Sequence, residues 1–197
     1  MLAPAFPESV LASQSAFRAV MDAFARPGEI KPLPPAPDPP APLSATAAAV
    51  AATLLDYETP VWLDHDLSRA PDVAEWLRFR TGARVTGDPG LAAFALIADA
   101  VRAPPFDVFC LGTAEYPDRS TTLVLEVQPF GQGRRLSLSG PGIADAVSFA
   151  AAPLPLDLRE RLLANRALFP RGVDLILVAP DAVVALPRSV RVAAEGA

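Results

Sequence analysis

The apolar positions near the end of the chain follow a pattern typical of two paired strands. Val173 to Val178 is a nearly continuous apolar run between Gly172 and Pro180, which predicts a strand buried on both faces. Pro180-Asp181 supplies a turn, and the run from Val183 to Leu186 predicts a second strand directly after it. We expect this pair to form the centre of a sheet.

Apolar residues at helical spacing predict the first helix. The spacing i, i+3, i+4 and i+7 indicates a helix that begins with Ser13 as its cap and runs to about Ala25, where Pro27-Gly28 stops it. Residues 1–12 are predicted to be a loosely held lead-in. The stripe expected to face the core consists of Phe17, Val20, Met21 and Phe24.

Further helices and strands are predicted along the rest of the chain. Ser44 caps an alanine-rich helix to about Asp56, in which Leu54 and Leu55 are the expected packing residues. Other helices are predicted at 71–79 and 156–167, and a helical turn before Leu111. Short strands are predicted at 61–63 and 94–97. Strands at 121–127 and 134–139 are predicted to form a hairpin around the Gly131-Gln-Gly133 turn.

A proline-rich connector covers residues 32–42 and contains seven prolines. Proline cannot donate a backbone hydrogen bond, so this segment can be neither an inner strand nor a helix interior. It is predicted to be an extended surface connection, with a ligand for a proline-recognising module as the alternative. No linker is long and polar enough to divide the chain. The fold class is therefore α/β, one domain over residues 1–197, with a mixed sheet flanked by helices.

Composition narrows the class of function. The formal net charge is −5, so no basic surplus is available for a phosphate backbone, and nucleic acid is not an expected partner. The first residues lack the positive region of a secretory signal, and the alanine-rich stretch from Ala45 to Leu55 is too short to span a bilayer. The single cysteine, Cys110, fits a reducing compartment. We expect a cytoplasmic protein with no membrane partner.

The inventory of catalytic side chains is small. The chain has one histidine, His65, and one lysine, Lys31, which borders the proline-rich connector and is a poor Schiff-base candidate. Asp64-His65-Asp66 could bind a cation weakly, but a solvated turn after the predicted strand is preferred. Common phosphate-binding motifs are missing. No metal and no cofactor is expected, and a scaffold or subunit fits better than a self-sufficient enzyme.

The alternative is a small-molecule binding protein or enzyme with a cleft at the strand ends. Gly140-Pro-Gly142 could present backbone N–H groups to an anion, or it could be a tight turn that ends a strand. Trp62 and Trp76 could likewise be interface anchors or core residues. The candidate ligand-binding residues are Asp56, Glu58, Thr59, Arg119, Gly140, Gly142 and Arg171.

Five segments, taken together and in order, resemble one protein family. They lie at residues 13–28, 53–63, 77–81, 138–143 and 169–189, and include Leu138-Ser-Gly-Pro-Gly-Ile143 and Phe169-Pro-Arg-Gly-Val-Asp174. In order and spacing, these segments resemble PhnH, the H subunit of the bacterial carbon–phosphorus lyase system of phosphonate metabolism.

The resemblance carries specific expectations. It implies a non-catalytic subunit of the carbon–phosphorus lyase core complex, with the G, I and J subunits as partners and a homodimer when isolated. That complex attaches a phosphonate to the ribose of a nucleoside triphosphate on the way to carbon–phosphorus bond cleavage. The implied fold resembles the large domain of pyridoxal-phosphate transferases without the cofactor site. The resemblance supplies no catalytic residues. A subunit role also predicts an apolar sheet edge or helix face that a partner covers.

Overall fold

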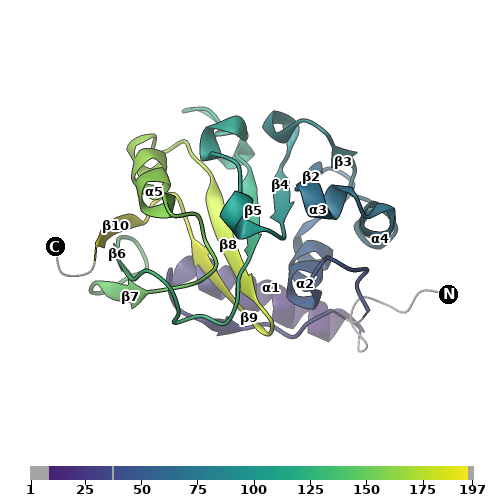
Figure 1. The fold of residues 1–197 in the computed structure, drawn as a ribbon, viewed down its shortest axis with the longest axis horizontal. Helices are drawn as coiled ribbons and strands as arrows, with labels where there is room; N and C mark the ends of the chain where they lie inside the picture. The colour runs from purple at the N-terminus through teal and green to yellow at the C-terminus, as the bar shows by residue number, and fades with distance from the viewer. Residues whose placement is uncertain (1–8, 37, 195–197) are drawn as a thin grey trace.

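A seven-stranded mixed sheet runs through the middle of the molecule (Figure 1). The structure is a computed structural model that describes residues 9–36 and 38–194. Strands β3, β2, β4, β5 and β8 are parallel, β9 pairs antiparallel with β8, and the edge strand β1 pairs antiparallel with β9. In spatial order the strands are β1 (Lys31–Pro32), β9 (Ala182–Leu186), β8 (Asp174–Ala179), β5 (Thr122–Glu126), β4 (Phe94–Ile97), β2 (Val61–Leu63) and β3 (Val85–Thr86).

The β8–β9 pair confirms the two strands and the turn predicted from the apolar pattern, but the predicted place at the centre is wrong, because β9 is next to the edge strand β1 and β5 is the middle strand. β8 and β9 pair in antiparallel register around Pro180-Asp181, with Ala179 opposite Ala182. All five residues of β9 are buried, as are the last five of β8. The α/β class is confirmed, as is the presence of a mixed sheet with helices on its faces.

A second, antiparallel sheet of three strands corrects the predicted hairpin. It contains β10 (Arg191–Ala194), β6 (Leu136–Ser139) and β7 (Val147–Phe149), with β6 in the middle. β6 therefore does not pair with β5, which lies between β4 and β8. The burial pattern gives the reason: only alternate residues of β6, Leu136 and Leu138, are buried, whereas a strand inside the parallel sheet is buried on both faces.

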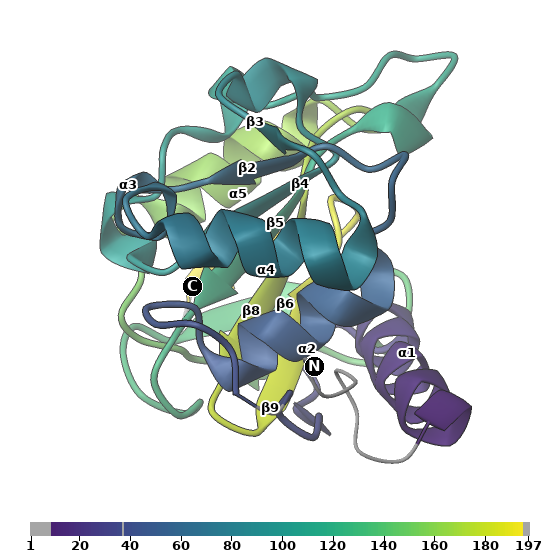
Figure 2. The same cartoon turned by 90° about the vertical axis from the view of Figure 1, so that its right-hand side faces the viewer.

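Helices cover the two faces of the large sheet unequally (Figures 1 and 2). One core joins α1, α2, α3 and α4 to side chains such as Val124 and Ile176; the other joins α5, the small sheet and the 98–110 loop to Leu123 and Leu175. Adjacent residues of each central strand thus point to opposite cores. The helices are α1 (Ser9–Ala25), α2 (Ala45–Leu54), α3 (His65–Ser68), α4 (Pro71–Thr81) and α5 (Leu158–Ala167).

Helix α1 departs from the prediction at its start and on its buried face. It begins at Ser9, so Ser13 is inside the helix and is not its cap, and residues 9–12 are not a lead-in; residues 1–8 lie outside the described part. The buried face is Ala16, Val20 and Ala23, because small residues let α1 approach α2 and β9 closely. Phe17 and Met21, expected in the core, are exposed.

Helix α2 confirms its predicted cap but not its packing residues. The Ser44 hydroxyl accepts a hydrogen bond from the Ala47 N–H at 3.2 Å. The buried helical residues run from Thr46 to Ala51, so alanines rather than the leucines supply most of the contact. Leu55 is buried just beyond the helix. None of the helices in residues 9–36 and 38–194 combines the length and apolar character that a bilayer crossing requires.

Candidate functional site

Three of the predicted ligand residues share one turn before β2. The hydroxyl of Thr59 accepts from the Asp56 N–H at 2.7 Å, and the Asp56 carboxylate accepts from the Glu58 N–H at 2.9 Å. These side chains therefore hold the turn itself, as short polar side chains commonly do. The turn places Asp56, Glu58 and Thr59 at the amino ends of the parallel strands.

The two predicted arginines lie at the same edge of the sheet, in the loops that enter β5 and β8. The Arg119 guanidinium lies 4.3 Å from the centre of the Tyr116 ring, and Arg171 is exposed. The side chain of Arg188 connects these loops by donating to the carbonyl oxygens of Pro117 and Pro170. The structure thus brings the segments of Arg119 and Arg171 together.

The predicted glycines lie elsewhere, at the end of β6 in the small sheet. Gly142 has a φ of +82°, and a Cβ there would lie 2.2 Å from the carbonyl oxygen of Ala25. Gly140 has a φ of +132°, and a Cβ there would lie 3.2 Å from the carbonyl oxygen of Ser189. The Ile143 N–H donates to the Gly140 carbonyl at 3.1 Å. This geometry is that of a tight strand-ending turn pressed against the end of α1.

A crevice at the opposite, carboxyl edge includes Asp64, His65 and Asp66 but none of the seven predicted ligand residues. The chain leaves β2 toward α3 and α4 on one face, whereas it leaves β4 toward Ala100 and Phe106 on the other face. Open parallel sheets bind ligands where neighbouring connections diverge in this way. The crevice has a volume of about 200 Å³ and is lined by Trp62, Asp64, His65, Asp66, Asp99, Arg102 and Pro104.

Most of the polar groups in the crevice are already engaged. Asp64 is 7% exposed and accepts backbone N–H bonds from Leu67, Ala98 and Asp99 at 3.0, 2.8 and 3.0 Å. The expected solvated turn at 64–66 is therefore wrong for Asp64, because its carboxylate caps α3 and ties β2 to the end of β4. The chain topology, and not the local sequence, brings Asp64 and Asp99 together.

Asp99 and Arg102 pair with each other, at 2.6 Å between the carboxylate and Nε. The Asp99 carboxylate raises the pKa of Arg102, mainly through this hydrogen bond. His65 and Asp66 remain exposed at the rim. Among the residues that the structure describes, no three His, Cys, Asp or Glu side chains gather as metal ligands would. The crevice can therefore bind a small polar molecule, but it holds no arranged nucleophile and base.

A half-buried carboxyl, Glu126, ends the central strand β5. It accepts a hydrogen bond from the Ser44 N–H at 3.0 Å, which links β5 to the start of α2. Burial raises the pKa of Glu126, and the Ser44 hydrogen bond opposes that shift only in part. An acidic residue at the end of an otherwise apolar run was the available sequence signal for this group.

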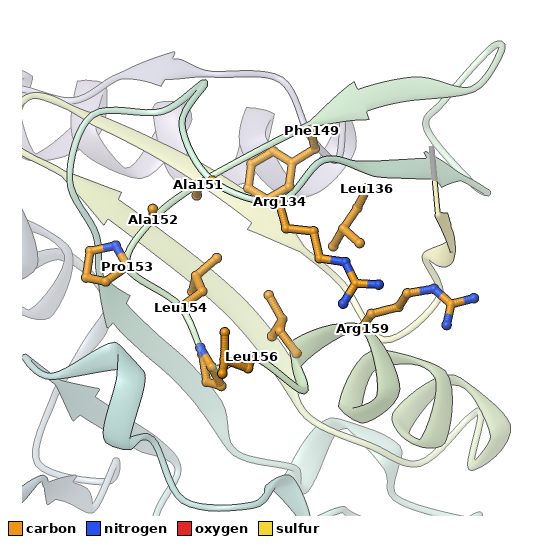
Figure 3. Close-up of a pocket in the computed structure, with 12 residues that line it drawn as sticks. Arg134, Leu136, Phe149, Ala151, Ala152, Pro153, Leu154, Leu156 and Arg159 are labelled. Carbon is orange, nitrogen blue, oxygen red and sulfur yellow. The ribbon is translucent and has the colours of Figure 1, made fainter. Parts of the chain in front are cut away.

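A larger pocket lies between the small sheet and α5 (Figure 3). Its volume is about 280 Å³. Figure 3 shows Arg134 and Arg159 on the side of the pocket next to α5, with Leu154 and Pro153 across from them. The residues lining it are Gly133, Arg134, Leu136, Phe149, Ala151, Ala152, Pro153, Leu154, Pro155, Leu156, Leu158 and Arg159.

Backbone contacts hold the walls of this pocket in place. The Gln128 N–H donates to the Ala152 carbonyl at 2.7 Å, and the Gly131 N–H donates to the Ala150 carbonyl at 2.9 Å. Gly133 has a φ of +92°, and a Cβ there would lie 2.7 Å from the Ala151 carbonyl oxygen. The pocket is thus preformed, and it combines an apolar interior with two guanidinium groups.

Comparison with known proteins identifies the family. The model of the family described as "Bacterial phosphonate metabolism protein (PhnH)" matches residues 4–193, nearly the whole chain. The chain belongs to the PhnH family. The region shared with PhnH proteins includes both the carboxyl-edge crevice and the pocket beside α5.

Two curated proteins are similar to the chain over most of their length. The chain is 47% identical over 191 residues to the alpha-D-ribose 1-methylphosphonate 5-triphosphate synthase subunit PhnH of Rhizobium meliloti (strain 1021), covering 97% of this chain and 95% of that protein. It is 32% identical over 187 residues to the putative C-P lyase subunit protein HtxG of Stutzerimonas stutzeri, covering 93% and 87%. Both relatives are named as subunits.

Proposed function

We propose that this chain is a non-catalytic subunit of a carbon–phosphorus lyase core complex, with subunits G, I and J as partners. In that complex a phosphonate is attached to the ribose of a nucleoside triphosphate before its carbon–phosphorus bond is cleaved. The observation that carries the proposal is the 47% identity, over 97% of the chain, to a PhnH subunit of a methylphosphonate triphosphate synthase. Family membership over residues 4–193 supports it.

The chemistry of the side chains also supports a subunit role. Two carboxylates of the carboxyl-edge crevice, those of Asp64 and Asp99, are engaged in the fold, and the chain has one histidine, one lysine and one cysteine. A self-sufficient transferase would need a positioned nucleophile, base or phosphate clamp. The reacting groups of the assembly therefore belong to the partner subunits.

Co-purification tests this proposal directly. The chain is tagged, expressed with the G, I and J subunits of its own organism, and the eluted species are weighed by native mass spectrometry. We expect one assembly that contains all four subunits, and a homodimer when the chain is expressed alone. Elution of the chain without the other three, under conditions where they assemble with one another, would show that the subunit role is wrong.

A second function is favoured by one observation, the crevice where the connections of β2 and β4 diverge. A small polar ligand such as a phosphonate or nucleotide could bind between His65, Asp66 and Arg102. Calorimetric titration of the isolated chain with methylphosphonate and with ATP tests this alternative. Stoichiometric binding that Arg102→Ala removes would support it, whereas the subunit proposal predicts no saturable heat from either compound.

A further inference from the structure

One side of α5 and the residues just before the helix combine exposed leucines with half-buried arginines. Leu156 is 93% exposed and Leu163 is 41% exposed, although both are large apolar side chains. Arg159, Leu163 and Arg166 are spaced i, i+4 and i+7, so they lie on one side of α5 over about 10 Å. The neighbouring side of the helix, with Leu158, Leu162 and Asn165, is buried. We call the set Arg134, Leu156, Arg159, Leu163 and Arg166 the α5 face.

The pocket of Figure 3 opens into this face. Leu156 and Arg159 line the pocket and belong to the α5 face, and Arg134 lies beside them from the loop before β6. The apolar exposure continues past the pocket to Leu163 and to Phe169, whose ring lies 4.6 Å from the Arg166 guanidinium. A small ligand would fill the pocket and leave these side chains in water. A protein segment can fill the pocket and also cover the exposed apolar side chains beyond it.

The charges of the α5 face define the chemistry of its occupant. Within the described residues, the Nε atoms of Arg159 and Arg166 are shielded from solvent and have no hydrogen-bond acceptor. Among the residues that the structure describes, Glu160 is the acidic side chain that pairs with this face, 3.6 Å from the Arg159 guanidinium, and Asp157 pairs with Arg161. Three arginines against one glutamate is a local cationic excess on a chain whose net charge is −5. Carboxylates are the acceptors that match guanidinium geometry.

We propose that the α5 face is a docking surface for an acidic segment of a partner subunit. A bulky apolar side chain of that segment enters the pocket beside Phe149 and Leu136, and its carboxylates pair with Arg134, Arg159 and Arg166. The inference rests on the proposed function, because it assigns the face by which this chain joins the assembly. The docking segment would cover the exposed leucines and pair with the arginine charges of this face.

Charge reversal tests the docking surface in the complete assembly. The double variant Arg134→Glu, Arg159→Glu is co-expressed with the G, I and J subunits, and the recovered partners are quantified. We expect at least a roughly tenfold loss of recovered partners, because like charges now face the acidic segment. The matched control is Arg78→Glu, Arg84→Glu, which makes the same charge change on exposed residues of α4 and the loop before β3. We expect that control to stay within about twofold of the parent chain.

The outcomes separate the two proposals. If the parent chain does not assemble, the subunit role is wrong and the docking surface with it. If the parent chain assembles and the Arg134→Glu, Arg159→Glu variant assembles equally well, only the docking surface is wrong. If that variant assembles but loses methylphosphonate binding that the parent chain shows, the pocket is a small-anion site and the docking proposal fails.

Photo-crosslinking gives a second readout that does not depend on charge. Replacing the highly exposed Leu156 with p-benzoylphenylalanine leaves the core untouched, and Leu91, 67% exposed near β3, serves as the control position. We expect a crosslink from position 156 to an acidic peptide of one partner subunit, and none from position 91. A crosslink from position 91 alone would move the docking surface to the β3 edge.

Discussion

Arg188 donates from both its backbone N–H and its side-chain Nε to one oxygen of Asp174, at 2.8 Å and 3.0 Å. Its Nη2 also reaches the second carboxylate oxygen. The two side chains are 13% and 18% exposed, so this is a largely buried pair. Because Arg188 also donates to Pro117, Ser120 and Pro170, the pair joins the loops entering β5 and β8 to the end of β9.

The first prediction concerns this pair. Arg188→Met leaves the Asp174 carboxylate buried without its partner, and we expect it to lower the free energy of unfolding by about 3–5 kcal/mol. Arg188→Lys should recover only part of the loss, since an ammonium cannot reproduce the forked set of hydrogen bonds. Urea unfolding measures both. The control is Arg26→Met, which removes an exposed pair with Asp22 and should change stability by less than about 1 kcal/mol.

The second prediction concerns Gly142, one of the residues expected to bind a ligand. Gly142→Ala places a Cβ against the Ala25 carbonyl at a positive φ, so we expect a loss of about 2–5 kcal/mol. Gly131→Ala is the matched control, because its φ is +90° but no atom lies within 4 Å of the new Cβ. It should lose only about 1–2 kcal/mol. Equal losses in thermal or urea unfolding would contradict the packing role of Gly142.

The third prediction concerns Asn165, whose side chain closes a buried contact with Val173. Its amide donates to the Val173 carbonyl and accepts from the Val173 N–H, both at 2.9 Å. Asn165→Ala leaves both backbone groups buried and unpaired, so we expect a loss of about 2–4 kcal/mol. Glu160→Ala, at an exposed position of the same helix, should change stability by less than about 0.5 kcal/mol. Chemical denaturation of the two variants makes the comparison.

The fourth prediction is a pH dependence from Glu126. Burial raises the pKa of Glu126 in the folded state above the ordinary value of 4.5. At pH values between the unfolded-state pKa and the folded-state pKa, the folded state therefore holds more protons than the unfolded state. The free energy of unfolding therefore falls as the pH rises through this window. Glu126→Gln keeps an acceptor for Ser44 and removes the titration.

Unfolding curves of the parent chain and of Glu126→Gln, measured side by side over roughly four pH units upward from about pH 4, give the contribution of Glu126 to the free energy of unfolding. The stability of the parent chain relative to Glu126→Gln should decline as the pH rises and then level off. Glu160→Gln, at an exposed carboxyl, provides the control for general charge effects. A relative stability that increases with pH would mean that the folded pKa of Glu126 is lowered.

The sequence predicted those parts of the fold whose signal is local. The apolar run of β8, the Pro180-Asp181 turn and the Ser44 cap each depend on neighbouring residues, and each was confirmed. The hairpin of β5 with β6 was wrong because sequence adjacency suggested a pairing that distant strands β4 and β8 prevent. Two-residue strands such as β3 have no pattern to detect. The resemblance to the large domain of pyridoxal-phosphate transferases stays a prediction.

The candidate sites show the same limit. Five of the seven predicted ligand residues come just before a strand in the chain and therefore lie at the amino edge of the parallel strands, whereas the crevice lies at the carboxyl edge. Asp64 and Asp99 meet only through the pairing of β2 with β4. The α5 face was equally hidden, because the exposure of Leu156 depends on how the 150–157 loop crosses the small sheet. Ligand binding by these seven residues stays a prediction.

The position of β5 between β4 and β8 also bears on how the chain folds during synthesis. β4 precedes β5 in the chain, but β8 is made only after β6, β7 and α5, so one edge of β5 stays open on the ribosome. The side chains of Leu123, Val124 and Leu125 make both faces beside that edge apolar, and at ordinary rates of translation the edge stays unpaired for a time on the order of seconds. The nascent protein is thus most prone to aggregation in that interval, which is when a chaperone would protect it.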